Sequence, residues 1–453
     1  MPHVLIVGAG AAGLMAAFFA GRAGAEVTVL EHNEKPGKKI YITGKGRCNC
    51  TNDCAPEDFL REVPRNPRFL YSALNGFSPQ DLISLLEENG CPVEVQRGRR
   101  AYPRSMKASD VTRTLVSLCR QQGVRILLNQ EVVSLRTAEN AAESAAAGAD
   151  TAVQAVSSAP AGVPAPEAGA EKGNSRVTGA VLRDGTFLPA DAVILATGGL
   201  SYPATGSTGD GYRMAKALGH TVTELLPSLI SLESAEAWPA RLQGLSLKNV
   251  RVTLKSGKKT LYSELGEMLF THFGFSGPLI LEASCHLPEE GKPFTLELDL
   301  KPGLTRDQLD ARLLRELEAG SRKQLRNMLP CLMPVSLAEI FPSLCGLPDQ
   351  LACNQVTSAQ RERLLSSLKA LPLPVLRRRP IAEAVITRGG IPVREVRPGT
   401  MESKIISGLY FAGEILDVDA HTGGYNLQIA FSTGALAGKS AAEAVQNSFP
   451  LTS

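Results

Sequence analysis

The sequence predicts an α/β fold organised around a Rossmann-like nucleotide-binding domain, and three observations near its start support this. A short apolar run, Val4–Val7, has the length of one buried parallel strand. It leads into Gly8-Ala-Gly-Ala-Ala-Gly13, a G-x-G-x-x-G turn that runs into helix-forming residues. A second strand, Glu26–Leu30, ends at Glu31 with the spacing typical of a dinucleotide site.

Each residue type in this turn has a physical task. Gly8 makes the tight turn, Gly10 lets the backbone approach a pyrophosphate, and Gly13 allows close packing of helix on strand. The helix N-terminus offers unpaired N–H groups to the phosphates. An acid at Glu31 accepts from ribose hydroxyls and repels a 2′-phosphate, which predicts the adenosine of FAD or NAD. The residues predicted to surround the pyrophosphate are Gly8, Gly10, Ala11, Ala12 and Gly13.

Composition limits the classes of function. At 453 residues the chain is long enough for two or three domains. A net charge of +3 favours neither a nucleic-acid nor a membrane partner, and no apolar run is long enough to span a bilayer. Nine cysteines without a visible secretory signal predict reduced thiols in a cytoplasmic protein. We expect its substrate to be a small molecule.

The segment Lys35–Asn52 is a loop rich in glycine, basic residues and hydrogen-bonding side chains. A solvated basic loop is one interpretation. We favour a second wall for the FAD pyrophosphate and flavin, because glycines let a backbone close over a ligand. Cys48, Cys50 and Cys54 lack the paired spacing of zinc ligands, so we expect unpaired thiols and no metal. The loop residues predicted to contact the cofactor are Lys39, Gly46, Arg47 and Asn49.

Changes of pattern along the chain predict three parts. Residues 1–200 and 385–453 form the FAD-binding domain, in which Ala138–Ser175 is a low-complexity insertion with little to bury. Residues 201–300 and 372–384 alternate in the manner of antiparallel strands in a small barrel. Residues 301–371 form a helical subdomain. The helices expected there are Asp307–Glu318, Ser321–Met328 and Ser358–Leu368.

Several motifs resemble known flavoproteins. Ala196–Gly199 with Thr208–Gly211 is similar to the flavin-contacting segment of fumarate reductase and succinate dehydrogenase flavoproteins. Nearly the whole chain, apart from Ala138–Ser175, resembles the FAD-binding flavoproteins described as aminoacetone-oxidase-like or as bile-acid-reductase-like, within the glutathione-reductase-like superfamily. The motifs that carry this resemblance are Ile42–Asn52, Tyr102-Pro103, Ala196–Pro203, Gly206–Tyr212, Phe270–Pro278 and Gly423–Gln428.

The resemblance implies noncovalent FAD and further residues that contact it. The backbone at Val132 would meet the adenine, Thr197 and Gly198 follow a buried strand, and the Gly413 turn would reach the ribityl chain. A C-terminal helix opens at about Asn426, and its N-terminus would face the flavin; an ordinary capped helix is the alternative. The flavin contacts implied are Val132, Thr197, Gly198, Gly413, Glu414, Asp417, Asn426 and Leu427.

Three functions follow from the resemblance. A reductase would transfer a hydride to an activated C=C bond, as in an enone of a steroid or bile acid, with NAD(P)H as donor. Because the chain carries only one dinucleotide fingerprint, NAD(P)H would dock transiently over the flavin. The alternatives are an oxidase of a small amine, and an RNA-modifying or noncatalytic flavoprotein. The fumarate-reductase-like Thr208–Gly211 favours the reductase.

Catalytic residues are expected in the loops next to the flavin segments. The candidates are Tyr202, His272, Arg388, His421 and Tyr425. We rank His421 first, because it precedes Tyr425 in a loop expected to reach the flavin and histidine titrates near neutral pH. Arg388 would hold a carboxylate or an enone oxygen. Alternatively, Tyr202 and Tyr425 pack on the flavin ring and His272 caps a helix.

Overall fold

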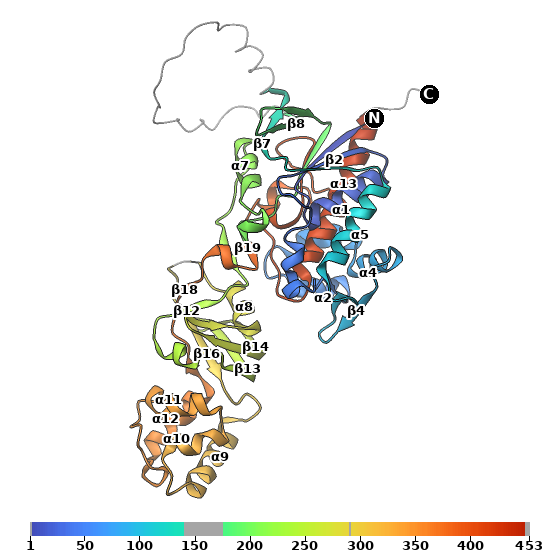
Figure 1. Cartoon of the computed structure of the whole chain (residues 1–453). Helices are drawn as coiled ribbons and strands as arrows, with labels where there is room; N and C mark the ends of the chain where they lie inside the picture. Colours follow the sequence, from blue (N-terminus) through green and yellow to red (C-terminus); the bar gives the residue numbers. More distant parts are fainter. Residues whose placement is uncertain (1, 140–174, 290, 449–453) are drawn as a thin grey trace, which may run out of the picture. The chain divides into compact units, whose positions relative to one another are not determined.

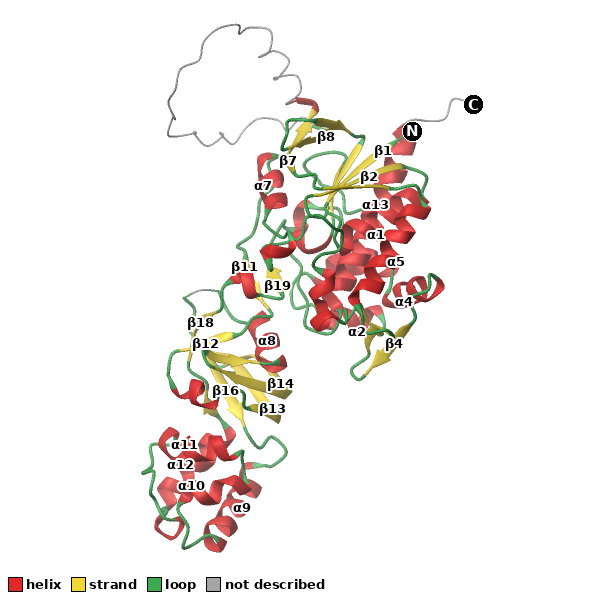
Figure 2. Cartoon of the chain, in the orientation of Figure 1, coloured by secondary structure: helices red, strands yellow, loops and turns green. Residues whose placement is uncertain are grey.

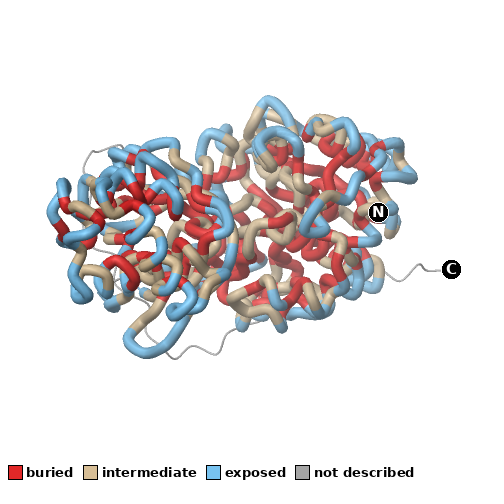
Figure 3. Tube along the Cα trace, turned by 90° about the horizontal axis from the view of Figure 1, so that it is seen from below, coloured by how far each residue is buried: buried red, intermediate tan, exposed pale blue. Residues whose placement is uncertain are grey.

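The computed structural model describes residues 2–139, 175–289 and 291–448 (Figure 1). The chain forms two compact units. The first unit runs to Leu226 and resumes at Ile386, so it extends past residue 200; the second unit is Pro227–Val385. Each unit has its own apolar core of buried residues (Figure 3).

The first unit is built on a five-stranded parallel sheet in the order β20-β10-β1-β2-β6. This confirms the predicted Rossmann-like core, in which the two strands around the glycine turn, β1 and β2, lie side by side (Figure 2). The last strand is short, since only Leu409–Phe411 pair. The strands are β1 (His3–Val7), β2 (Glu26–Glu31), β6 (Arg125–Leu128), β10 (Ala192–Leu195) and β20 (Leu409–Phe411).

Helices α1 (Ala11–Arg22) and α13 (Tyr425–Ser448) pack on this sheet, and α5 (Ala108–Gln121) packs on α1. Helices α1 and α13 approach each other unusually closely, since a Cβ on Gly434 would lie 2.3 Å from Ala12 O. Glycine is therefore required there for packing, and the contact fixes α13 against the helix that follows the glycine turn.

Between β2 and β6 the first unit carries a small antiparallel sheet with three helices around it. Ser78 is the N-cap of helix α4, and its side chain forms a capping box with Asp81. A second antiparallel sheet contains a hairpin around Gly185. These elements are α2 (Pro56–Arg61), α3 (Tyr71–Gly76), α4 (Pro79–Glu88), β3 (Thr51–Asn52), β4 (Val93–Gln96), β5 (Arg100–Pro103), β7 (Val132–Thr137), β8 (Val177–Leu182) and β9 (Phe187–Pro189).

Most of the low-complexity segment, residues 140–174, lies outside the described residues. The strands on either side pair antiparallel, with Thr137 opposite Val177, so a short turn can join them. We therefore expect deletion of Ala141–Asn174 to leave the fold and the FAD content unchanged, because its composition offers little apolar surface to bury. Thermal unfolding and flavin absorbance of the deletion variant measure this. A loss of FAD in that variant would contradict the prediction.

The second unit contains a seven-stranded antiparallel sheet in the order β17-β16-β13-β14-β15-β12-β18, with α8 (Pro278–Cys285) packed on it. The antiparallel strands were predicted, but they form an open sheet, with β17 and β18 as its two edges, in place of the expected barrel. The strands are β12 (Leu232–Ser234), β13 (Ser246–Ser256), β14 (Lys259–Thr271), β15 (Gly274–Ser276), β16 (Thr295–Asp299), β17 (Leu371–Pro372) and β18 (Val375–Arg378).

The helical part of the second unit agrees with the sequence at α9 (Arg306–Ala319) and α12 (Ser358–Lys369), which both begin with a threonine capping box. The helix expected over Ser321–Met328 is wrong in its first half, because α10 is only Leu325–Met328. Helix α11 (Val335–Leu344) was not predicted, since it contains a proline, which usually ends a helix.

A buried hydrogen-bonded cluster joins the segment after α7 (Asp210–Ala217) to the chain before β20. His220 Nδ1 lies 3.0 Å from Glu395 Oε2, and His220 Nε2 lies 2.9 Å from Ser403 Oγ. The hydrogen bonds link a serine to a histidine and the histidine to a glutamate, as in a hydrolytic triad. However, Ser403 is buried, and its oxygen accepts hydrogen bonds from the backbone N–H groups of the following turn. The cluster therefore stabilises the fold.

Glu395 makes this cluster sensitive to acid. Burial alone raises the pKa of Glu395, but hydrogen bonds from Thr221 and His220 outweigh it and the pKa lies below the ordinary 4.5. A depressed carboxyl pKa stabilises the fold above the unfolded value, and this stability is lost as the pH falls through the folded value. Glu395→Gln should lower the free energy of unfolding by about 1–3 kcal/mol at neutral pH. Urea unfolding should show the difference shrinking below pH 4.5; a pH-independent difference would contradict this assignment.

Candidate functional site

The glycine turn forms a cradle between β1 and α1. Gly8 adopts a positive φ of 101°, and a Cβ on Gly13 would lie 1.8 Å from Gly8 O, so both glycines are required by the protein itself. A Cβ on Gly10, in contrast, would meet no protein atom within 4 Å. Open space beside the N-cap of a helix fits a pyrophosphate, whose oxygens would take the first N–H groups of α1.

Glu31 is buried at the end of β2, as a ribose-binding acid should be. One carboxylate oxygen accepts from Ala9 N–H at 2.8 Å, and the other accepts from Asn33 N–H at 2.9 Å. Glu31 therefore also ties the glycine turn to the loop after β2. The second oxygen also accepts from the Asn33 side-chain amide at 2.7 Å, so the oxygen bonded to Ala9 is the one that keeps a further lone pair for a ribose hydroxyl.

Three buried oxygens in the Lys35–Asn52 loop and in the turn after β10 have no hydrogen-bond partner within the described part of the chain. They are Asn49 Oδ1, Thr51 Oγ1 and Thr197 Oγ1. Buried polar atoms are normally hydrogen-bonded, so these atoms mark places where a bound polar group completes the structure. Residues Asn49 and Thr197 were predicted to contact FAD, and Thr51 was not.

Two other predicted contacts, Lys39 and Glu414, bind each other. Lys39 Nζ lies 2.5 Å from Glu414 Oε2, and the second carboxylate oxygen accepts from Thr387 N–H and Ser201 Oγ, both at 2.8 Å. The pair thus joins four segments at the carboxyl ends of the parallel strands. Asp417 is buried with Arg65 3.8 Å away, and one of its oxygens lacks a hydrogen bond.

The loop before α13 is shaped by Gly423 and Gly424, which both have positive φ. A Cβ on Gly424 would lie 2.4 Å from the backbone of Thr51, so this loop lies directly on β3. Helix α13 begins at Tyr425, one residue before the predicted start. The Asn426 side chain closes the loop through hydrogen bonds with both backbone groups of Ala420, at 2.9 and 2.7 Å.

The structure brings two of the five catalytic candidates together in this loop. His421 Nδ1 donates to Glu62 Oε2 at 3.0 Å, and the two backbones are joined by His421 N–H to Glu62 O at 2.9 Å. The Tyr425 ring packs edge-on against Phe59, with centroids 5.0 Å apart. His421 and Tyr425 are thus both held against α2 and the residue that follows it.

The other three candidates lie elsewhere. Tyr202 is half-buried with a positive φ of 51°, and Arg388 ends the short strand β19 (Ile386–Arg388). His272 is exposed in the second unit, in the turn between β14 and β15. It does not cap α8, whose N-cap is Gly277.

A cavity of about 470 Å³ opens beside Tyr425 in the first unit. Arg47, predicted as a cofactor contact, lines it with Tyr425. The other lining residues were not predicted as site residues. The one indication in the sequence was the high positive charge of the turn-rich stretch Arg97–Arg104. The full lining is Arg47, Asn52, Glu62, Gln96, Arg97, Gly98, Arg100, Tyr102, Thr422, Gly423 and Tyr425.

A family model described as the HI0933-like protein Rossmann domain matches residues 2–181 and 170–440. The chain belongs to the HI0933-like family. A curated relative from Clostridium scindens, named 3-dehydro-bile acid delta(4,6)-reductase, is 30% identical over 449 residues, which are 98% of this chain and 100% of the relative. A Haemophilus influenzae protein named ribosomal RNA dihydrouridine synthase is 30% identical over 95% of this chain and 96% of its own length.

A solved structure shares the fold of this HI0933-like chain. The 3-ketosteroid-delta4-(5alpha)-dehydrogenase of Rhodococcus jostii, in complex with 4-androstene-3,17-dione, aligns with a TM-score of 0.50, 16% identity and 97% of each chain. Family and fold together confirm the sequence-based conclusion that this protein is an FAD-dependent oxidoreductase. The open cradle at Gly10 and the unpaired oxygens fit that cofactor.

Eight of the nine cysteines of this HI0933-like protein are buried, and Cys331 is exposed. All nine are free thiols, which confirms the prediction for Cys48, Cys50 and Cys54. Burial raises the pKa of the Cys48 thiol to about 12, so it stays protonated. Within the described ranges, no group of side chains is arranged to hold a metal ion, and no helix is long and apolar enough to cross a membrane.

Proposed function

We propose that this protein reduces a carbon–carbon double bond conjugated to a carbonyl group, with NAD(P)H as the electron donor. FAD, when bound, supplies hydride transfer to a carbon. The observation that carries the proposal is the pair His421–Glu62, which presents a supported proton donor in the loop before α13. Reduction of such a bond needs one hydride and one proton, and a positioned histidine is the usual source of the proton.

The names of the relatives support this reaction class. A 3-dehydro-bile acid delta(4,6)-reductase acts on double bonds conjugated to a ketone. Dihydrouridine is uridine whose ring double bond beside a carbonyl has been reduced, so a dihydrouridine synthase saturates the same kind of bond. In a conjugate addition to such a bond, the hydride goes to the carbon remote from the carbonyl and the proton to the carbon next to it.

The protein's own residues divide the remaining work. Glu62 holds the His421 ring through Nδ1 and so fixes its orientation. Arg388 is proposed to polarise the carbonyl oxygen, since a guanidinium donates without losing its proton. Tyr202, Tyr425 and His272 remain candidates for substrate contacts. The NAD(P)H is proposed to dock transiently, because the sequence holds one dinucleotide fingerprint and FAD takes it.

A uridine in RNA is the second candidate substrate, and the cavity beside Tyr425 favours it. Three arginines line that cavity, which suits a phosphodiester better than a steroid nucleus. Relatives from Haemophilus influenzae and Escherichia coli, 30% and 28% identical, are named ribosomal RNA dihydrouridine synthases. The expectation of no nucleic-acid partner came from a net charge of +3, which does not register a local cluster of arginines.

The test is a substrate comparison with FAD-loaded protein. NAD(P)H consumption and hydrogen peroxide formation are followed with a conjugated oxo-steroid acid, with unmodified ribosomal RNA and with a small primary amine. We expect NAD(P)H consumption to match formation of saturated product with the steroid acid or the RNA. Peroxide formed from the amine without NAD(P)H would instead establish the oxidase alternative and overturn the proposal.

A further inference from the structure

The cavity beside Tyr425 carries an excess of positive charge. Arg47, Arg97 and Arg100 line it, and Glu62 is its one carboxylate. That single carboxylate, which also accepts from the His421 ring, is outnumbered by three guanidinium charges. The cavity is therefore electrostatically suited to an anion.

The three arginines lack carboxylate partners within the described residues. Arg47 donates Nε to Gly44 O at 3.2 Å, and no ion pair involves Arg97 or Arg100. Arg99, in the same turn, does not line the cavity, and it has Asp58 3.6 Å away. The arginine outside the cavity thus has a carboxylate beside it, whereas the arginines that line the cavity keep their full positive charge for a ligand.

The cavity walls are fixed before any ligand arrives. Arg47 and Arg97 lie on different segments, and Asn52 joins the walls by donating to Gly98 O at 3.0 Å and to Gly423 O at 3.3 Å. The Arg47 guanidinium lies over the Tyr102 ring, 5.2 Å from its centroid. The backbone of these walls and the Arg47 guanidinium are therefore in place before a ligand binds, which lowers the ordering cost of binding.

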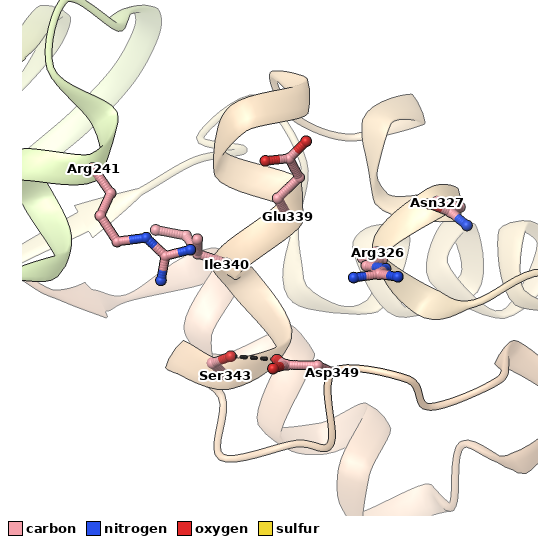
Figure 4. Close-up of a pocket in the computed structure, with 7 residues that line it drawn as sticks. All are labelled: Arg241, Arg326, Asn327, Glu339, Ile340, Ser343 and Asp349. Carbon is pink, nitrogen blue, oxygen red and sulfur yellow. Dashed lines mark hydrogen bonds between the residues drawn. The ribbon is translucent and has the colours of Figure 1, made fainter.

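A second polar cavity, of about 330 Å³ in the helical part of the second unit, has a different charge balance. There Arg241 and Arg326 face Glu339 and Asp349, and Asp349 accepts from Ser343 (Figure 4). Two carboxylates offset two arginines, so that cavity does not select for an anion. Of these two cavities, the one beside Tyr425 therefore has the excess of positive charge.

We propose that Arg47, Arg97 and Arg100 form a phosphate-binding subsite for the nucleotide that reacts in this enzyme. Guanidinium groups match phosphate oxygens with two parallel hydrogen bonds, and about 470 Å³ is room for a phosphate with part of its nucleoside. The phosphate comes either from a pyrimidine nucleotide of the substrate or from NADPH. This inference rests on the proposed function in one respect, because it takes the bound nucleotide to be either the substrate or the electron donor of the proposed reaction.

The test measures binding to oxidised, FAD-loaded protein, so it needs no turnover and its failure is distinct from failure of the proposed reaction. Titration calorimetry with uridine 5′-monophosphate, uridine and NADP⁺ compares wild type, Arg97→Gln/Arg100→Gln and the matched control Arg99→Gln. We expect the double variant to weaken binding of one phosphate-bearing ligand at least about tenfold, as for a lost charge-assisted contact. Binding of uridine and the behaviour of Arg99→Gln should stay within about twofold of wild type.

Each outcome decides the proposal. Weakened binding of uridine 5′-monophosphate assigns the phosphate to the substrate, and weakened binding of NADP⁺ assigns it to the electron donor. If the double variant binds little FAD, the exposed Arg97→Gln and the charge-preserving Arg97→Lys replace it, and the lysine should recover part of the affinity. Unchanged affinities, an equal loss in Arg99→Gln, or no binding of any phosphate ligand to wild type would overturn the subsite.

Discussion

Gly10→Val should abolish FAD binding while the protein stays folded. A Cβ at this position would meet no described protein atom within 4 Å, so we expect the fold to accept the side chain, but it fills the space proposed for the pyrophosphate. We expect flavin absorbance to be absent from the purified variant and its apo form to unfold at the temperature of apo wild type. Flavin absorbance and thermal unfolding measured on the same preparation decide this.

Two comparison variants separate cofactor loss from damage to the fold. Gly399→Val places the same side chain in open space elsewhere in the first unit and should keep FAD. Glu31→Arg should lose FAD and also stability, because Glu31 accepts from Ala9 N–H. Full flavin occupancy in both Gly10→Val and Glu31→Arg would contradict the assignment of the nucleotide site.

His421→Ala should slow the chemical step about 10²-fold or more, as expected for loss of a general acid. FAD should stay bound, since none of the residues proposed to hold the pyrophosphate depends on this ring. Stopped-flow measurement of the half-reaction with the acceptor substrate gives the rate directly. Reduction by NAD(P)H should change much less, because it requires no proton from His421.

Glu62 provides the matched comparison for this prediction. Glu62→Gln keeps the shape of the side chain but loses the charge that holds the His421 ring, so it should reduce the rate less than His421→Ala. Glu57→Gln, on an exposed residue of α2, is the control and should behave as wild type. Acceptor half-reactions unchanged in His421→Ala would remove His421 from the mechanism.

The nucleotide site could be predicted because its signals are local. The turn from Gly8 to Gly13 and the acid at Glu31 belong to one continuous strand-turn-helix-strand unit, and the structure has each element in place. The start of α13 was predicted within one residue for the same reason, since Gly423 and Gly424 mark the turn before it.

The cavity could not be predicted because its walls come from distant parts of the chain. Glu62 reaches His421 across 359 positions of sequence, and Arg97 becomes part of the site only when the β4–β5 turn meets the loop before α13. The net charge of the chain also gave no sign of this cavity. Arg99, which has an ion-pair partner, and Arg97, for which the described residues show none, contribute equally to the net charge.

Local rules also failed where tertiary packing overrode them. Helix α11 forms despite Pro342, because its apolar residues are buried in the core of the second unit. The antiparallel strands were recognised by alternation, but alternation alone does not say whether a sheet closes. Closure depends on pairing between the first and last strands, which is a long-range property.

The most direct test of the proposed reaction is the fate of one hydrogen atom. FAD-loaded protein is reduced anaerobically with stereospecifically deuterated NAD(P)H, and a conjugated oxo-steroid acid or ribosomal RNA is then added in a single turnover. We predict a saturated product with deuterium on the carbon remote from the carbonyl and a solvent-derived proton on the carbon next to it. Reduced protein that is reoxidised only by oxygen, leaving both acceptors unchanged, would contradict the account.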